Sequence, residues 1–530
     1  MSAASDLPAG PRDPYAPRRP PGREQSRPQA DKPSRRPSRV KAFNLSASDP
    51  PIQWRRGRLA AEQSLIEWPR LPPPEPGRSV IGQFALVVGV SLLSALAVVA
   101  FYGFADLTQT FDEGPGSADP PAAVVATPGA PASVAAAVPV IAALPSRAAA
   151  VRGLTDSEIR FGIAAPFSGP ARELGRQMKL GLDTAFGAIN DAGGINGRQL
   201  RLIAVDDGYE PSRTLGAMKD LVEKQGVFGI VGNVGTPTAT VALPYALQQK
   251  MLFFGAFTGA GLLRRDPPDR YVFNYRASYA EETEATVNYL VKVRRLKPDQ
   301  IAVFAQQDGY GDSGYAGVVK AVRALHGDPD RVLRLNYTRN TVDVDPAVKA
   351  LRAHKGPIKA IIMVPTYRAA ARFIEKTHDL YPGLIYTNVS FVGSTALAEE
   401  LKLLGPQYAD GVIVTQVVPA VDGYSSFVLD YKKALALEFP GEAADYVSLE
   451  GYVAGSLLAE GLRRTGPQVD TEKLVDALES LRDYDAGLGT PLTFGRTEHQ
   501  ASHRVWGTQL TAEGRYQLFD IQSSPPGKRE

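Results

Sequence analysis

Repeated strand-then-helix units between Ile159 and Thr258 constrain the fold more than any other feature of this sequence. Short polar loops end the apolar runs of these units, as in IRFGIAAPFSG, FGIVGNVGTPT and LFFGAFTGA. This alternation predicts a parallel sheet covered by helices. In such a sheet, ligands bind beyond the carboxyl ends of the strands, where helix N-termini offer free backbone N–H groups. The chain places Ser168, Thr236 and Thr258 at these ends.

Several motifs in this region follow the order and spacing of a known family. They are PFSGP, the helix-and-turn run LGLDTAFGAINDAGGINGRQLRLIAVDDGYEP, the loops GNVGTPT and GAFTGAGLLR, and the later QQDGYGDSG. Through them the chain resembles the type I periplasmic solute-binding proteins, typified by the leucine/isoleucine/valine-binding protein, over roughly residues 159–522. The resemblance implies two doubly wound α/β lobes that are joined by three crossovers and close over a small ligand. It also implies a protein that is not an enzyme.

The alternation of strands and helices continues beyond the first lobe and sets the expected boundaries. Strands are predicted near 271–275, 300–305, 331–337, 360–364, 390–392 and 411–415, and the segments PLTF, HRVWGTQL and RYQLFDIQ are strand-like. We expect a binding domain at 156–522, followed by a C-terminal tail at 523–530. Mapped on the sequence, one lobe covers about 157–276 and 418–488, and the other covers about 277–417 and 489–522.

The resemblance assigns the ligand contacts to loops from both lobes. Thr236 would hold a ligand carboxylate with its hydroxyl and the N–H groups that follow it, although ordinary helix capping before Pro237 is the alternative. Tyr310 and Tyr367 would close over the ligand from the facing lobe, and packing is the alternative for both rings. The full expected set is Phe167, Ser168, Gly235, Thr236, Ala256, Thr258, Tyr310, Tyr367, Ser394 and Thr395.

Thr395 departs from the pattern of the amino-acid-binding relatives. Those relatives carry an acidic residue at this place, which pairs with the ligand ammonium, whereas the loop here is FVGSTAL. A cation closed in a cleft without a partner costs several kcal/mol. The departure therefore predicts a ligand other than an ordinary α-amino acid, so leucine, isoleucine and valine are expected to bind poorly. Glu282 and Asp308 are the alternative carboxylates.

Residues 1–155 differ in composition from the rest of the chain. Residues 1–78 hold fifteen Lys and Arg, eight Asp and Glu and sixteen Pro, which predicts a disordered basic tail. No charged residue occurs from Val80 to Phe104, so residues 79–104 are long enough to span a bilayer as one helix. The Ala- and Pro-rich residues 105–155 would form a tether. A cleaved signal ending near Ala100 or Ala105 is the alternative.

Other classes of function are weakly supported. The segment GYGDSG at 309–314 matches the dinucleotide fingerprint, but Tyr310 would crowd a pyrophosphate, so an NAD-dependent oxidoreductase is a remote alternative. The chain has no cysteine, which excludes thiolate metal sites and disulfides. His499 and His503 stand in a strand-like context, where their spacing does not aim both rings at one metal. No metal, cofactor or nucleic acid is expected.

Two functions are open for such a protein. It would deliver a small polar organic ligand, such as an amino acid, amide or carboxylic acid, to an ABC permease. Alternatively, it would act as a sensing or scaffold subunit that signals through a partner membrane protein, with residues 52–71 of the tail lying on anionic lipid or docking that partner.

The membrane topology can be tested directly. Because the arginine-rich side precedes the predicted span, the N-terminus should lie in the cytoplasm and the binding domain in the periplasm, as in a single-pass inner-membrane protein. A reporter fused after Glu530 should be active only outside the cytoplasm, and one placed near Arg23 only inside. A mature protein that starts after Ala100 would instead identify the span as a cleaved signal.

Overall fold

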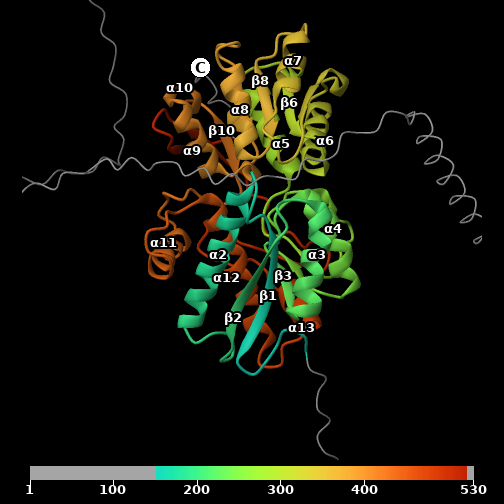
Figure 1. The fold of residues 1–530 in the computed structure, drawn as a ribbon, viewed down its shortest axis with the longest axis vertical. Helices are drawn as coiled ribbons and strands as arrows, with labels where there is room; N and C mark the ends of the chain where they lie inside the picture. Colours follow the sequence, from blue (N-terminus) through green and yellow to red (C-terminus); the bar gives the residue numbers. More distant parts are fainter. Residues whose placement is uncertain (1–150, 522–530) are drawn as a thin grey trace, which may run out of the picture. The chain divides into compact units, whose positions relative to one another are not determined.

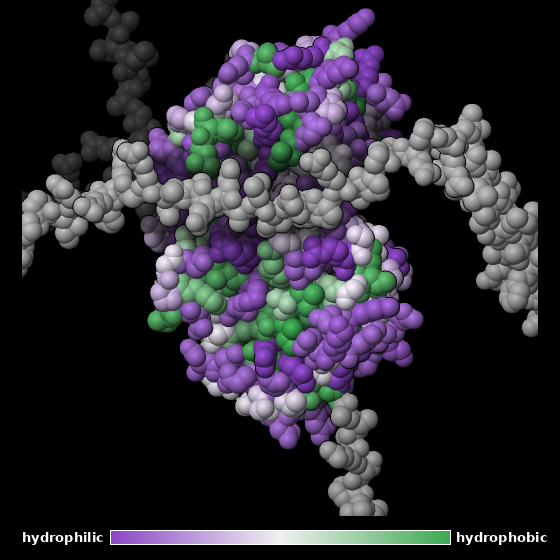
Figure 2. All heavy atoms as spheres, in the orientation of Figure 1, coloured by the Kyte–Doolittle hydropathy of each residue, from purple (hydrophilic) through white to green (hydrophobic). Residues whose placement is uncertain are grey.

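The computed structural model describes residues 151–521 (Figure 1). The expectations for the basic tail, the span at 79–104, nearly all of the tether and the C-terminal tail lie outside these residues. Among the helices of the described part, none is both long enough and apolar enough to cross a membrane. On the face that Figure 2 shows, polar side chains surround apolar ones that gather near the middle of the first lobe.

The first lobe is built on a five-stranded parallel sheet in the order β2-β1-β3-β4-β5. Its strands are β1 (Glu158–Ala165), β2 (Gln199–Asp206), β3 (Gly229–Val231), β4 (Phe253–Phe254) and β5 (Val272–Phe273). Its helices are α2 (Arg172–Asp191), α3 (Pro211–Lys219) with η2 (Asp220–Lys224), α4 (Thr236–Gln248), the turn η3 (Gly261–Leu263), and later α11 (Ser426–Glu438), α12 (Tyr446–Thr465) and α13 (Thr471–Glu479).

Helices α2 and α12 lie side by side on one face of this sheet (Figure 1). Glycines allow them to approach closely. A Cβ atom on Gly181 of α2 would lie 1.9 Å from the carbonyl oxygen of Ser448 of α12, and one on Gly451 would lie 2.5 Å from the carbonyl oxygen of Met178. The C-terminal part of the chain therefore returns to complete the first lobe.

The second lobe holds a seven-stranded sheet in the order β12-β11-β10-β9-β8-β6-β7. Strands β6 (Ile301–Gln306), β7 (Leu333–Tyr337), β8 (Ala360–Val364), β9 (Ile385–Asn388) and β10 (Ile413–Gln416) are parallel, and β11 (Trp506–Leu510) and β12 (Tyr516–Phe519) add antiparallel strands. Its helices are α5 (Tyr279–Asn288) with η4 (Tyr289–Val293), α6 (Gly309–Ala324), α7 (Asp345–Ala353), α8 (Tyr367–Thr377), α9 (Ser394–Leu404) and α10 (Pro406–Ala409), with the short turns η5 (Pro298–Gln300), η6 (Pro329–Arg331) and η7 (Ser390–Val392).

The strand predicted at 390–392 is wrong. These residues form the 3-10 turn η7, and the strand of this unit is β9, which ends at Asn388. Gly393 follows the turn with φ of 84°, a left-handed conformation that glycine adopts without strain, and α9 begins at the next residue. The apolar pair Phe391 and Val392 therefore bends away from the sheet and is buried outside it.

The chain crosses between the lobes three times, and the third crossing lies later than expected. The first two crossings fall between β5 and α5 and between β10 and α11. The chain before the third crossing still packs on the first lobe. Phe494 lies edge-on against Phe273 with a centroid distance of 5.2 Å, and Gln500 forms a backbone β-bridge with Asn274 beside the first sheet. The crossing therefore lies between Gln500 and Trp506 rather than near residue 488.

A buried arginine in the first crossing joins carboxylates from the two lobes. Arg276 is 1% exposed, its Nη2 donates to Glu282 Oε1 of α5 at 3.0 Å, and its Nη1 lies 3.6 Å from Glu450 Oε1 of α12. The Glu282 carboxylate also accepts from the Ser390 N–H at 2.8 Å and from the Thr415 hydroxyl. Burial raises the pKa of Glu450 to about 7, although the charge of Arg276 opposes this shift.

The other two crossings are tied to the same segment. The Tyr275 hydroxyl donates to the carbonyl oxygen of Val417 in the second crossing at 2.9 Å. Arg264 donates to the carbonyl oxygen of Arg276 at 3.0 Å and to the side chain of Gln500 at the start of the third crossing. All three crossings are therefore fixed around one buried charge network.

Loss of this arginine should destabilise the protein strongly. Arg276→Met leaves Glu282 and Glu450 buried without their cation, so we expect the free energy of unfolding to fall by about 3–5 kcal/mol in urea titrations. The control is Arg331→Met, whose partners Asp299 and Asp328 are largely exposed, and which should cost about 1 kcal/mol or less. Equal losses in the two variants would contradict the central role of Arg276.

Candidate functional site

Thr236 and Thr258 meet at the carboxyl ends of β3 and β4, as the order of strand ends predicts. Their Oγ1 atoms lie 2.7 Å apart, and both residues are at most 1% exposed. Gly235 turns the chain into α4 with φ of 104°, and no side chain caps this helix end. The Thr236 hydroxyl is therefore bonded to Thr258 rather than to the backbone of its own helix. We call these two residues the hydroxyl pair.

Five aromatic rings from the two lobes are buried together beside the hydroxyl pair. Phe391 is in the centre, with ring-centroid distances of 4.7 Å to Tyr310, 4.9 Å to Phe257, 6.1 Å to Tyr209 and 6.3 Å to Tyr279. Each of the five is at most 1% exposed. The Tyr279 hydroxyl lies beside Thr258, and the Arg276 guanidinium lies 5.1 Å from the centre of the Phe257 ring. We call these five rings the aromatic cluster. They pack the two lobes against each other.

One rim of the cleft is held by polar contacts between the lobes. Tyr209 has φ of 61°, which is uncommon for a residue other than glycine, and its hydroxyl accepts from Gln306 Nε2 at 3.1 Å. On the same rim, Arg339 Nη2 donates to Glu210 Oε2 at 2.9 Å, and Asn340 Nδ2 donates to Glu210 Oε1 at 2.6 Å. Burial of Glu210 raises the pKa of its carboxyl group. The hydrogen bonds from Asn340 and Arg339 outweigh this effect, so the pKa is lowered.

Ser168 is exposed and bound within its own lobe. Its hydroxyl donates to Asp206 Oδ2 at 2.6 Å, and the Phe167 N–H donates to Asp206 Oδ1 at 2.8 Å. Burial raises the pKa of Asp206, but the bonds from Ser168, the Phe167 N–H and Arg213 outweigh it and lower the value to about 2. The ligand contacts expected of Phe167 and Ser168 stay predictions.

The remaining predicted residues lie at different distances from the hydroxyl pair. Ala256 is buried, and its carbonyl oxygen accepts from the Thr258 N–H at 2.8 Å. Ser394 points into the second lobe, where Gln416 Nε2 donates to its hydroxyl at 2.9 Å. Tyr367 and Thr395 line a cavity of about 400 Å³ between the lobes, formed by the start of α2, the segment 442–445, the start of α8 and α9. We call it the outer cavity.

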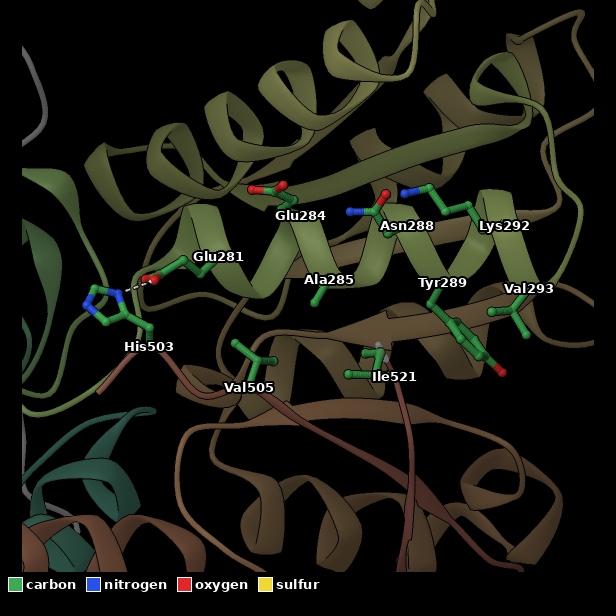
Figure 3. Close-up of a pocket in the computed structure, with 10 residues that line it drawn as sticks. All are labelled: Glu281, Glu284, Ala285, Asn288, Tyr289, Lys292, Val293, His503, Val505 and Ile521. Atoms are coloured by element: carbon green, nitrogen blue, oxygen red, sulfur yellow. Dashed lines mark hydrogen bonds and ion pairs between the residues drawn. The ribbon is translucent and has the colours of Figure 1, made fainter. Parts of the chain in front are cut away.

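A second cavity, of about 330 Å³, lies on the second lobe along α5 and η4 (Figure 3). Val505 and Ile521 face the helix across it, and His503 Nδ1 lies 2.6 Å from Glu281 Oε1. It contains none of the predicted ligand residues and lies outside the aromatic cluster. His499 is elsewhere, stacked on Phe273 at a centroid distance of 3.9 Å. Within 151–521, no group of acidic or histidine side chains is placed to hold a metal ion.

Gly311 and Gly314 in the 309–314 segment have a packing role. A Cβ atom on Gly311 would lie 1.9 Å from the carbonyl oxygen of Gln306, and one on Gly314 would lie 2.6 Å from Val364 Cγ2. Asp308 caps the helix by accepting from the Tyr310 N–H at 3.0 Å. The close contact of α6 with β6 and β8 therefore accounts for the second and third glycines of the dinucleotide-like pattern.

Sequence reasoning missed four residues of the aromatic cluster. Phe257 stands between the predicted Ala256 and Thr258, but it was not itself predicted. Tyr209 follows the end of β2 directly, in the loop DDGYEP, so the same rule that found Thr236 would have found it. Phe391 was assigned to a strand, which hides its place in the cleft. Tyr279 opens α5, and only the path of the first crossing brings its ring to Thr258.

Comparisons with known proteins agree with this architecture. The family model described as periplasmic binding protein matches residues 158–515. Among curated proteins, the Leu/Ile/Val-binding protein BraC3 of Rhizobium johnstonii is 25% identical over 349 residues, which cover 65% of this chain and 89% of that protein.

Solved structures extend the agreement to the fold. A possible leucine/isoleucine/valine-binding protein from Rhodopirellula baltica is 39% identical with a TM-score of 0.66, and the match covers 71% of this chain and 99% of that one. An ABC transporter solute-binding protein from R. palustris, in complex with benzoate, is 18% identical with a TM-score of 0.60, and the match covers 70% of this chain and 98% of that one; at this identity the likeness shows the fold alone. The chain therefore belongs to the type I periplasmic binding proteins of the leucine/isoleucine/valine-binding family.

Proposed function

We propose that this protein captures a small organic carboxylate between its lobes and delivers it to an ABC-type permease. The observation that carries the proposal is the hydroxyl pair, which is buried between the lobes at the start of α4. Proteins of this family bind solutes rather than transform them, and we extend that non-enzymatic role to this chain.

The chemistry around the hydroxyl pair suits a carboxylate. A helix start that no side chain caps offers backbone N–H donors and a positive dipole end, both of which favour an anion. Two hydroxyls beside that helix end add further donors, and hydrogen bonds to a charged acceptor are stronger than neutral ones. The aromatic cluster would enclose the rest of the ligand in an apolar wall, which is the usual composition of a small-molecule site.

Ligand entry requires the lobes to separate, because the aromatic cluster fills the space beside the hydroxyl pair. Separation breaks the stacking of Phe391 on Phe257, the bond from Gln306 to Tyr209 and the ion pair of Arg339 with Glu210. Closure of two lobes about a few crossing residues is a hinge motion. Binding would then exchange part of the ring contacts for contacts with the ligand.

We favour the uptake hypothesis over the sensing hypothesis because of the proteins to which this chain is similar. The relative from Rhizobium johnstonii is a Leu/Ile/Val-binding protein and the 39% identical structure from Rhodopirellula baltica is a possible one, which fits the capture of a solute for uptake. The sensing or scaffold hypothesis rests on the N-terminal tail alone. Anchoring by residues 79–104, with the binding domain on the periplasmic side, is part of the same proposal and is tested by the reporter fusions.

Ligand binding is tested by a thermal-shift screen of amino acids, amides, short-chain acids and aromatic acids, followed by calorimetry. For the best ligand, Thr236→Ala and Thr258→Ala should each weaken binding by about ten- to a hundredfold, because a donor to a charged carboxylate contributes roughly 1.5–3 kcal/mol. Thr240→Ala, on the exposed side of the same helix, should leave affinity unchanged. Unchanged affinity in the first two variants would show that the hydroxyl pair is not the site.

Delivery is tested in cells with the labelled ligand found by the screen. A strain that lacks this protein should take up the ligand more slowly, and the Thr236→Ala variant should fail to restore the rate that the wild-type protein restores. If uptake is unchanged and only a transcriptional response to the ligand disappears, the sensing hypothesis replaces the uptake proposal.

A further inference from the structure

Strand β2 forms an open edge of the first sheet. It stands at the end of the strand order, so only β1 pairs with it. In Figure 1 the strands of this lobe lie between α2 and α3, and Figure 2 shows apolar side chains near the middle of the same lobe. The five residues from Leu202 to Asp206 are all half-buried, although successive side chains of a strand point to opposite faces. This uniform exposure indicates that the uncovered part of β2 is its edge rather than one of its faces.

Alternate residues of β2 turn their backbone groups away from the sheet. The Gln199 N–H donates to the carbonyl oxygen of Ser157 at 2.8 Å, and the Asp207 N–H donates to that of Ala165 at 3.1 Å. Both bonds lead to the β1 side, so the odd-numbered residues of β2 point toward β1. The even-numbered residues, from Leu200 onward, therefore present their N–H and C=O groups to the outside.

Side chains pair with this outer edge at its two ends. The Asn190 side chain donates to the Leu200 carbonyl oxygen at 2.9 Å and accepts from the Leu200 N–H at 2.7 Å. At the other end, Arg213 Nη2 donates to the Asp206 carbonyl oxygen at 3.2 Å.

The middle of the edge is left open. Within residues 151–521, the outward N–H and C=O groups of Leu202 and Ala204 have no hydrogen-bond partner. Unpaired backbone groups along an apolar edge are where a further extended segment can add to a sheet. The closed ends limit the added strand to a few residues.

The tether segment 134–144 has the sequence that such an edge requires. It reads VAAAVPVIAAL and carries no charge. Proline has no N–H, so in an edge strand its nitrogen must face away from the partner strand. Pro139 and Pro145 are both odd-numbered. In a strand whose prolines face outward, Val140, Ala142 and Leu144 all direct their N–H groups toward β2.

The path of the chain brings this segment to the same sheet. The first described residues lie beside the start of β2, where Arg198 Nε donates to the carbonyl oxygen of Thr155 at 2.8 Å. From Leu144 to Val151 the chain can span roughly 25 Å. This reach exceeds the roughly 10 Å that separate the start of β2 from Leu202.

We propose that residues 138–144 of the tether add to the open edge of β2 as a short sixth strand of the first sheet. Residues 105–137 are then the free part of the tether. The docked strand fixes which side of the first lobe is turned toward the proposed membrane anchor. This interaction does not depend on which ligand the cleft binds.

The test places prolines at neighbouring positions of the tether in the full chain. Ala142→Pro removes an N–H that faces β2, whereas Ala143→Pro removes one that faces outward and is the matched control. Hydrogen exchange of a peptide that contains Leu202 and Ala204 is measured by mass spectrometry. Exchange should be about tenfold faster in Ala142→Pro than in the wild-type protein and unchanged in Ala143→Pro. Neither substitution lies in the described lobes, so their fold is preserved.

Three results would overturn the proposal. The first is exchange of this peptide that is as fast in the wild-type protein as in Ala142→Pro. The second is an equal effect of the two prolines, which would exclude pairing in the proposed alternation. The third is exchange that slows as the protein concentration rises and ignores both prolines, which would identify the occupant of the edge as β2 of a second copy.

Discussion

The ion pairs of Arg276 are the constraint on which the two-lobe arrangement depends. A buried guanidinium is costly to take out of water, and carboxylates held close to it offset part of that cost. One of these carboxylates belongs to α5 in the second lobe and the other to α12 in the first. The crossings must therefore keep both lobes near this charge. The tyrosine and arginine contacts to the other two crossings fix the remaining segments around it.

The cleft above this network separates two kinds of chemistry. Beside the hydroxyl pair, the walls are almost entirely aromatic, so the few polar atoms act in a dry environment where hydrogen bonds to a charged group are strong. In the outer cavity, charged side chains dominate and most are paired with one another. Asp445 caps the start of α12 and is hydrogen-bonded to Thr395 of the opposite lobe.

The sequence predicted the parts of the site that depend on local rules. Strand ends located Thr236 and Thr258, and the alternation of strands and helices predicted parallel sheets covered by helices. The division into two lobes was implied by the family resemblance. It could not place Phe391, because a turn and a strand share the same short apolar pattern and Gly393 decides between them only through its backbone conformation. Asp445 stands about 50 residues beyond Thr395 in sequence and reaches it only because α12 returns to the first lobe. Ser168 was placed at the correct strand end, but a short bond to Asp206 holds its hydroxyl.

The position of Arg276 also limits how the lobes can move. Its guanidinium has one edge toward each lobe, and the two ion pairs differ in length, 3.0 Å to Glu282 and 3.6 Å to Glu450. A rotation centred on the guanidinium changes both distances little, whereas a sliding motion of equal size would pull one carboxylate out of reach. An arginine in this position would therefore serve as a pivot for the opening of the lobes proposed above, in which Arg339 and Glu210 separate.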